Sequence, residues 1–404
     1  MIAPFRQIGK DFGGLTFGGV GHKNLVMRLG FDLRPFLREE TGVGKYLRNL
    51  LFELAKIDRT NEYFLFSSSW KDRFPDEKIP PFARREFRDC RFPVRTLNWL
   101  WRKRRRPSLD FFFRTELDLV HSATPLIVPT RGKKVITVHD LFFMDFPDQA
   151  GWEAGKVFFR LAAASFRNAD GIVTPSTVTA IEIISRFAVD EKKLRVIPHG
   201  LEKRFLEEVP AAELMATRKR SNLPASFLLF VGAQEPRKNL VRLVEALKII
   251  HRCGFQIALV LAGPPGEDSA VIRAKAESLG ISHWVMTTGY LSDSEIRNIY
   301  RLATAFVMPS LCEGFGMPLI EAMASRVPVA ASRVSAMPEV CRDAAVYFLP
   351  DSPEDMAEKI SSVIRDEDLR NELIAKGRER ALDFRWEKAA AETLAFYESL
   401  VQGQ

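Results

Sequence analysis

The sequence contains few cysteines and no long apolar run. Its four cysteines, Cys90, Cys253, Cys312 and Cys341, are far apart in the 404 residues, and no CxxC pair or histidine lies at the spacing of a zinc site. We therefore expect reduced thiols, no bound metal and a cytoplasmic protein. No stretch approaches the roughly 20 apolar residues that cross a bilayer, so we expect any contact with the inner face of the membrane to be peripheral.

The first 26 residues also lack the features of a folded or a targeting segment. They contain many glycines, no regular periodicity and no apolar core of a signal peptide. We expect residues 1–26 to form a flexible tail, or to result from an upstream start codon, and Met27 to Asp32 to be the first strand.

The size and charge of the chain limit its class. A length of 404 residues suits two domains, and 46% apolar with 27% charged residues is an ordinary balance for folded domains. The net charge of +8 favours anionic partners, namely nucleotide diphosphates, acidic lipids or nucleic acids. Charge alone does not choose among these partners.

One stretch, Met308 to Glu321, has the features of a phosphate-binding turn. The apolar run from Ala305 to Met308 suits a buried strand, and Pro318 suits the first turn of a helix that begins near Met317. The glycines between strand and helix allow a ligand to approach the backbone closely. The unpaired amides of such a helix start attract a diphosphate.

Two carboxylates flank this turn. Glu313 precedes the glycines, and we place Glu321 in the first turn of the helix. Each could then hold a hydroxyl of a nucleotide-sugar on one side of the phosphates. The alternative is that Glu321 only complements the helix dipole and that Glu313 is a solvated loop acid.

The same stretch resembles a known signature. The spacing of Glu313 and Glu321 around Gly314-Phe315-Gly316, followed by Ala322-Met323-Ala324, is similar to that of the family 4 retaining glycosyltransferases, which have the GT-B fold. The resemblance covers about Met27 to Leu400 and is to a subgroup rich in mannosyltransferases. It implies a donor site that includes Glu313, Gly314, Phe315, Gly316, Met317, Leu319 and Glu321.

A second glycine turn lies in the first half of the chain. Gly42 and Gly44 follow the first predicted strand and precede a helix with leucines on one face. The third glycine of the dinucleotide fingerprint is missing, so NAD binding is a weak interpretation. The resemblance implies a loop that closes over the donor diphosphate, and a tight turn without a ligand is the alternative.

His139 follows a predicted strand over 135–138. Ligands collect at the carboxyl ends of strands in open parallel sheets, although a lone histidine there is more often structural. The resemblance implies that His139 faces the donor sugar, where a neutral imidazole can hydrogen-bond a hydroxyl or a phosphate oxygen.

Two cations precede a predicted helix in the second half of the chain. Arg237 and Lys238 stand before an amphipathic segment over about 240–250, where the helix dipole disfavours positive charge unless an anion is bound. The resemblance implies that Lys238 binds the donor diphosphate with help from Arg237, since Ala233 stands where many relatives have an arginine. It also implies that the backbone around Leu291 reads the base.

A basic run with aromatic neighbours lies in the first half. Trp99 and Trp101 adjoin Arg102 to Arg106, a pattern typical of a peripheral contact with an anionic membrane or an acidic acceptor. A solvated helix end is the alternative. We expect no nucleic-acid binding, because base-reading features are missing.

Strands alternate with helices in both halves, which indicates doubly wound α/β domains. Together with the resemblance, this predicts the GT-B fold, in which two Rossmann-like domains face a cleft. We expect a tail (1–26), an acceptor-side domain (27–200), a nucleotide-sugar-binding domain (201–385) and a C-terminal helix that packs back on the first domain (386–404).

The resemblance implies a retaining hexosyltransferase, with GDP-mannose as the favoured donor and a glycan or lipid-linked acceptor in polysaccharide or lipopolysaccharide assembly. Glu313, His139 and Lys238 are the candidate catalytic residues, and the cations make a metal or other cofactor unnecessary. A UDP-glucose or UDP-N-acetylglucosamine transferase of the same fold is the alternative. Less favoured are a glycoside hydrolase that uses Glu313 and Glu321, and a non-catalytic sugar- or nucleic-acid-binding protein.

Overall fold

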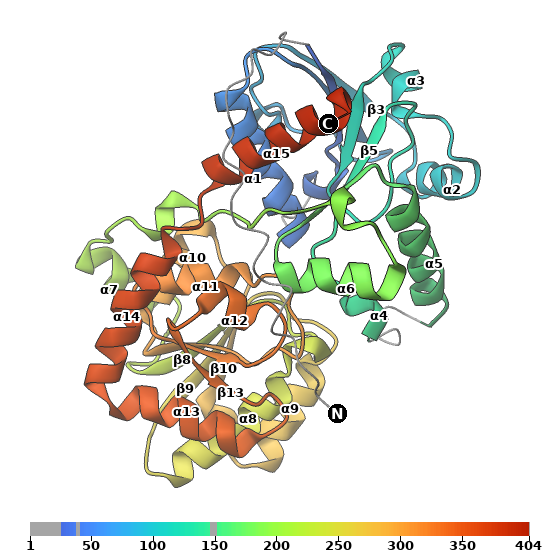
Figure 1. Cartoon of the computed structure of the whole chain (residues 1–404). Coiled ribbons are helices and arrows are strands. Elements are labelled where there is room, and N and C mark those ends of the chain that lie inside the picture. The colour runs from blue at the N-terminus through green and yellow to red at the C-terminus, as the bar shows by residue number, and fades with distance from the viewer. Residues whose placement is uncertain (1–25, 38–40, 146–151, 404) are drawn as a thin grey trace.

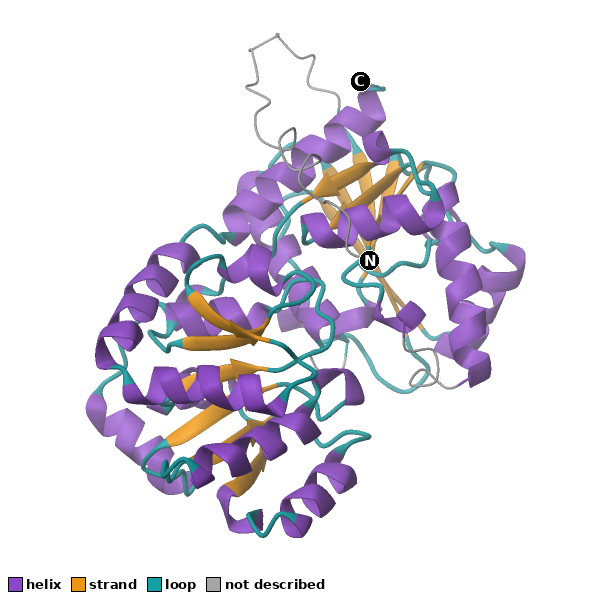
Figure 2. Ribbon diagram, turned by 60° about the horizontal axis from the view of Figure 1, so that its bottom comes forward, coloured by secondary structure: helices purple, strands orange, loops and turns teal. Residues whose placement is uncertain are grey.

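The computed structural model describes residues 26–37, 41–145 and 152–403 (Figure 1). The predicted tail 1–26 therefore lies almost wholly outside the described residues. The described chain forms two parallel β-sheets, each with helices on both faces (Figure 2). The alternation of strands and helices predicted two doubly wound domains, and the structure confirms them.

The first sheet has seven strands in the order β3-β2-β1-β4-β5-β6-β7. They are β1 (Arg28–Asp32), β2 (Glu62–Ser68), β3 (Arg85–Cys90), β4 (Leu119–Ser122), β5 (Lys133–Thr137), β6 (Gly171–Thr174) and β7 (Leu194–Val196). The helices are α1 (Gly42–Ile57), α2 (Val94–Arg104), α3 (Leu109–Phe113), α4 (Phe142–Asp145), α5 (Trp152–Asn168) and α6 (Thr177–Phe187). The chain order reverses between β1 and β4, and ligands commonly bind at such a reversal.

The second sheet has six strands in the order β10-β9-β8-β11-β12-β13. They are β8 (Phe227–Val231), β9 (Ala258–Ala262), β10 (Val285–Gly289), β11 (Ala305–Met308), β12 (Val329–Ser332) and β13 (Ala345–Phe348). The helices are α7 (Ala211–Arg220), α8 (Leu240–Arg252), α9 (Ser269–Ser278), α10 (Asp293–Leu302), α11 (Met317–Ala324), α12 (Met337–Cys341), α13 (Pro353–Arg365) and α14 (Glu367–Ala381). Here the order reverses between β8 and β11. The segment with Arg237 and Lys238 follows β8, and the glycine turn around Phe315 follows β11.

The last helix, α15 (Trp386–Gln402), returns from the second domain to the first and lies beside α1 (Figure 1). Phe396 and Tyr397 of α15 are buried in the same apolar cluster as residues of β1 and α1. A β-carbon at Gly171 of β6 would lie 2.8 Å from the Phe396 ring, so the helix packs directly on the sheet.

A carboxylate joins the two domains at a second place. Glu339 of α12 accepts hydrogen bonds from the backbone amides of Thr177 (2.8 Å) and Val178 (3.2 Å), which begin α6 in the first domain. These amides have no acceptor within their own helix, and the helix dipole favours a carboxylate there. The second domain therefore supplies part of the N-terminal cap of a first-domain helix.

Two features differ from the expectations. Gly42 and Gly44 lie in the first turn of α1, not in a loop before it, because the Thr41 side chain caps the helix by accepting from the Gly44 amide (3.2 Å). Trp101 was expected at a membrane interface, but this residue of α2 is buried on the inner face of the helix. Its indole N–H donates to the carbonyl of Pro107 (2.8 Å). Trp99, which is 50% exposed, is left as the aromatic part of that surface.

Candidate functional site

The two domains meet where β5 and β11 end. The loop after β11 places Gly314 against the carbonyl group of His139, which follows β5, and a β-carbon at Gly314 would overlap that oxygen. Gly42 at the start of α1 faces Met317 at the start of α11, where a β-carbon on Gly42 would lie 3.6 Å from the Met317 methyl group. These predicted site residues therefore lie together at the carboxyl edges of both sheets.

Lys238, Glu313 and Arg237 form a buried ionic cluster on the second-domain side. Lys238 Nζ lies 2.5 Å from Glu313 Oε1, and a terminal nitrogen of Arg237 lies 3.3 Å from Glu313 Oε2. Lys238 is 7% exposed and Glu313 is 8% exposed. Burial alone would raise the pKa of Glu313, but Lys238 and Arg237 hold it below the ordinary value of a glutamate. The Glu313 carboxylate is therefore charged at neutral pH.

The turn before α8 holds Lys238 in this position. Asn239 adopts a left-handed conformation with φ of 57°, and its side-chain amide donates to the carbonyls of Pro309 (3.0 Å) and Pro350 (2.8 Å). The Leu311 amide donates to the carbonyl of Arg237 (2.8 Å). The backbones that carry the lysine and the glutamate are thus bonded to each other.

Arg237 also faces the first domain. Its guanidinium carbon lies 5.4 Å from the centre of the Phe142 ring on α4, and its Nε donates to Glu235 (2.8 Å). Burial raises the pKa of Asp140 above the usual range of an aspartate, although Arg237 opposes this. Carboxyl groups from both domains therefore surround the guanidinium.

The start of α11 has the conformation that its glycines predicted. Gly316 adopts φ of 89°, a conformation that favours glycine, and no side chain among the described residues caps the helix. Pro318 has no N–H and the Leu319 amide donates to the carbonyl of Gly316 (2.9 Å), so it is mainly the positive end of the helix dipole that favours an anion here. Phe315 and Leu319 are buried and hold the turn, with the Phe315 ring centre 5.0 Å from that of His199.

Glu321 lies one turn deeper than expected. It is the fifth residue of α11, so it does not complement the dipole of the first turn, and its Oε2 accepts a hydrogen bond from the Tyr300 hydroxyl (2.8 Å). Burial raises the pKa of Glu321, with Lys45 of α1 and the Tyr300 hydroxyl opposing. Tyr300 and Lys45 were not predicted as neighbours of Glu321, because each lies within a helix and far from Glu321 along the chain.

His139 is partly buried among aromatic rings and is neutral. Its Nε2 lies 3.0 Å from the carbonyl oxygen of Ala123, and its Nδ1 lies 3.3 Å from Nε2 of His199. The Tyr46 ring packs at 4.9 Å from His139 and at 4.8 Å from His199. Burial lowers the pKa of His139 to about 4, although the hydrogen bond to the Ala123 carbonyl opposes this shift. The imidazole is therefore uncharged at neutral pH, and both of its ring nitrogens have partners within the protein.

Leu291 lies away from this cluster along the edge of the second sheet. It follows β10, and β9 separates that strand from β8, which precedes Lys238, so β10 and β8 are about 10 Å apart at the usual strand spacing. Ser292 and Glu295 form a capping box at the start of α10, and Asp293 pairs with Arg204. A ligand that touches both Leu291 and Lys238 must be elongated, as a nucleotide-sugar is.

Two family models match the chain. Residues 41–204 match the model described as "Glycosyltransferase Family 4", and residues 215–380 match the model described as "Glycosyl transferases group 1". The chain belongs to the family 4 glycosyltransferases. Between them, the two matches include all the residues of this glycosyltransferase that form the site.

Named relatives agree with this assignment. The chain is 26% identical to the O-antigen chain mannosyltransferase B of Escherichia coli, over 93% of this chain and 100% of that protein. The structure of sucrose-phosphate synthase from Thermosynechococcus elongatus has a TM-score of 0.74 at 22% identity, covering 93% of this chain and 99% of that one. Anabaena HepE in complex with UDP and glucose has a TM-score of 0.70 at 17% identity, covering 92% and 100%. The structural likenesses confirm the predicted GT-B fold.

We predict that this glycosyltransferase loses stability as the pH falls from 6.5 toward 5. Burial lowers the pKa of His121 to about 3, that of His139 to about 4 and that of His199 well below its ordinary value. Because the unfolded chain then binds protons that the folded chain does not, each histidine lowers the free energy of unfolding with a slope that grows from about 0.7 kcal/mol per pH unit at pH 6.5 to about 1.3 near pH 5. Urea unfolding at pH 7, 6 and 5 measures this.

The same pH series, run on two variants, distinguishes the contribution of the buried histidines from that of other titrating groups. His121→Gln should make the slope shallower, whereas the matched change of the exposed His283 to Gln should leave it as in the wild type. A stability that is flat between pH 6.5 and 5 would contradict the burial argument.

Proposed function

We propose that this glycosyltransferase transfers mannose from GDP-mannose to a hydroxyl of a glycan or lipid-linked acceptor, with retention of the anomeric configuration and without a metal. The observation that carries the proposal is the Lys238–Glu313–Arg237 cluster beside the uncapped start of α11. It offers cations and amides to a diphosphate, and a carboxylate to a sugar hydroxyl. The mannosyltransferase named above supports mannose and O-antigen assembly.

In this proposal the negative charge that develops on the leaving diphosphate is stabilised by groups already present. Lys238, Arg237 and the N-terminal end of the α11 dipole supply positive potential on the second-domain side, and the start of α1 at Gly42 and Gly44 closes over it. These groups replace the charge that a metal would supply. EDTA should therefore leave transfer intact.

The remaining side chains position the sugar. Glu313 accepts from a sugar hydroxyl away from the reacting carbon, His139 contacts the sugar from the first domain, and Glu321 holds the ribose hydroxyls. The acceptor oxygen attacks the anomeric carbon on the face that the diphosphate leaves, and a phosphate oxygen takes the acceptor proton. The C–O bond to the diphosphate breaks as the new glycosidic bond forms.

A UDP-sugar donor is the second candidate, because the HepE structure contains UDP and glucose. A glycoside hydrolase is less favoured. Such an enzyme would have no use for the two cations, Lys238 and Arg237, that flank Glu313.

We predict a selective thermal stabilisation by GDP and GDP-mannose in the presence of EDTA. A ligand at 100 times its Kd adds about 2.7 kcal/mol to the free energy of unfolding, which a thermal scan detects. GDP, UDP and ADP and their sugars are compared at equal concentration. Selective stabilisation by UDP would change the proposed donor to UDP-glucose or UDP-N-acetylglucosamine. No stabilisation by any nucleotide would contradict a nucleotide-sugar site.

We predict that Glu321→Gln removes recognition of the ribose. In the wild type, GDP should stabilise more than 2′,3′-dideoxy-GDP, because the Glu321 carboxylate accepts from the ribose hydroxyls. The variant should respond equally to both nucleotides. Glu277→Gln, a matched change on the exposed surface of the same domain, should keep the difference. An unchanged preference in Glu321→Gln would assign the ribose contact to another group.

We also propose that the enzyme works at the inner face of the membrane, with Trp99 and Arg102 to Arg106 as the contact. Among the described residues, no helix is long and apolar enough to span a bilayer. Trp99 is half exposed, and the arginines lie at the end of α2 and just after it. Each cation near an anionic surface adds about 1 kcal/mol to the binding free energy.

We predict that the protein sediments with vesicles of phosphatidylglycerol and not with vesicles of phosphatidylcholine, and that salt weakens the binding. Trp99→Ser should reduce the bound fraction. Trp70→Ser is the matched control, since Trp70 is 69% exposed on the same domain but lies outside the basic run. Equal binding of both variants, or binding that salt does not change, would contradict this surface.

A further inference from the structure

A cavity of about 420 Å³ lies in the first domain between α2 and α5. Its lining includes Asp32 at the end of β1, Asn98 and Trp101 of α2, and Thr124 after β4. The volume is in the range of small-molecule sites. None of the residues assigned above to the donor lines it.

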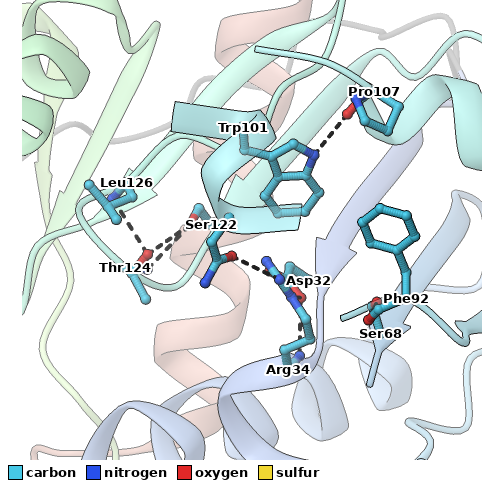
Figure 3. Close-up of polar contacts among 10 residues, drawn as sticks. Asp32, Arg34, Ser68, Phe92, Trp101, Pro107, Ser122, Thr124 and Leu126 are labelled. Atoms are coloured by element: carbon cyan, nitrogen blue, oxygen red, sulfur yellow. Dashed lines mark hydrogen bonds and ion pairs between the residues drawn. The ribbon is translucent and has the colours of Figure 1, made fainter. Parts of the chain in front are cut away.

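One wall of the cavity is a polar cluster built on Arg34 (Figure 3). Its guanidinium donates to Asp32 Oδ1 (2.8 Å) and Oδ2 (2.6 Å) and to the side-chain oxygen of Asn98 (3.0 Å). It also lies 4.5 Å from the centre of the Trp101 ring. Among the described residues the amide nitrogen of Asn98 has no acceptor, so it can donate to a ligand.

Other lining residues are apolar, with Leu126, Ile127 and Leu161 among them. Planar carboxylate, guanidinium and amide groups match the paired hydroxyls of a sugar ring, and an apolar or aromatic wall matches its C–H face. The cavity therefore has the chemistry of a site for one hexose unit.

The cavity shares two chain segments with the reaction site. Ser122 and Thr124 line it, and the carbonyl of Ala123 between them is the partner of His139 Nε2 (3.0 Å). Pro35 also lines it, and a β-carbon at Gly44 would lie 2.8 Å from the Pro35 carbonyl oxygen. A hexose in the cavity would thus lie next to the first-domain wall of the donor site.

Two arginines without a carboxylate partner border the same cavity. Arg102 and Arg105 line it, both are exposed, and neither forms an ion pair with any residue that the structure describes. By contrast, Arg34 is neutralised by Asp32 (2.6 Å). The free guanidinium groups favour a phosphate, which they can bind with two parallel hydrogen bonds.

We propose that this cavity binds the acceptor, with a hexose against Asn98 and Trp101 and the phosphate attached to that hexose at Arg102 and Arg105. The inference rests on the proposed glycosyl transfer and names its acceptor class, a hexosyl phosphate. Both a lipid-linked and a free sugar phosphate have this chemistry.

The test measures binding by calorimetry with saturating GDP, so that the donor site is occupied. The probes are the 1-phosphates of mannose, glucose, galactose and N-acetylglucosamine, their methyl glycosides, and mannose linked to a short prenyl diphosphate. At least one sugar phosphate should bind about tenfold more tightly than its methyl glycoside, which is the gain expected from one charge-assisted hydrogen bond. Tighter binding of the prenyl compound than of the free phosphate identifies a lipid-linked acceptor, and equal binding identifies a free one.

The variants locate the binding. Arg105→Asn combined with Arg102→Gln should remove the preference for the phosphate, and Asn98→Ala should weaken both kinds of probe. Arg114→Asn is the matched control, because Arg114 is also an exposed, left-handed residue at the C-terminus of a first-domain helix but does not line the cavity. Asparagine tolerates that conformation, so neither change strains the backbone.

Two results overturn the inference: no probe binds, or the cavity variants bind every probe as the Arg114 control does. The GDP-induced thermal shift of each sample keeps this outcome distinct from a failure of the proposed function. If GDP and the other nucleotides stabilise the protein but the probes do not depend on the cavity, only the acceptor site is wrong. If no nucleotide stabilises it, the donor proposal fails as well.

Discussion

The ion pair between Lys238 and Glu313 is the interaction on which the site depends. The two charges are nearly inaccessible to water and neutralise each other, with Arg237 as a second partner of Glu313, and removal of one partner from such a pair typically costs about 3–5 kcal/mol. The pair also requires that the turns after β8 and β11 lie side by side, which the bonds of Asn239 secure. In the proposed function, a diphosphate replaces Glu313 as the partner of Lys238, and a sugar hydroxyl replaces Lys238 as the partner of Glu313.

The first domain completes the site through close backbone contact and a chain of polar groups. Gly314 touches the His139 carbonyl, so a larger residue would push the domains apart. Beneath His139, the hydroxyl of Thr137 bonds both the Tyr46 hydroxyl (3.0 Å) and His121 (2.7 Å), and His121 in turn bonds Tyr397 of α15. The C-terminal helix is thereby connected to the rings that surround His139.

Much of this could be predicted from local patterns in the chain. Apolar runs such as Phe227 to Val231 indicate central strands. The glycines around Phe315 indicated the turn that connects β11 to α11. The helix predicted after Lys238, over about 240–250, was marked by the apolar residues on one of its faces, and α8 confirms it. These signals act within a few residues.

The contacts that were missed connect distant parts of the chain. The Glu321 bond to Tyr300, the Glu339 cap on α6 and the burial of Trp101 depend on how helices pack, which the spacing of residues does not encode. The cavity behind Arg34 is of the same kind, since β1, α2, α5 and the segment after β4 all line it.

The most direct test of the central claim is the affinity of GDP and GDP-mannose for the wild type, Lys238→Met and Glu313→Gln, measured by calorimetry. If Lys238 binds the diphosphate and Glu313 binds the sugar, Lys238→Met should weaken the binding of both ligands by about tenfold or more. Glu313→Gln should bind GDP at least as tightly as the wild type, because a competing carboxylate is gone, and should lose both its preference for GDP-mannose and its turnover. Near-normal turnover in Glu313→Gln, or equal loss of GDP binding in the two variants, would contradict the account.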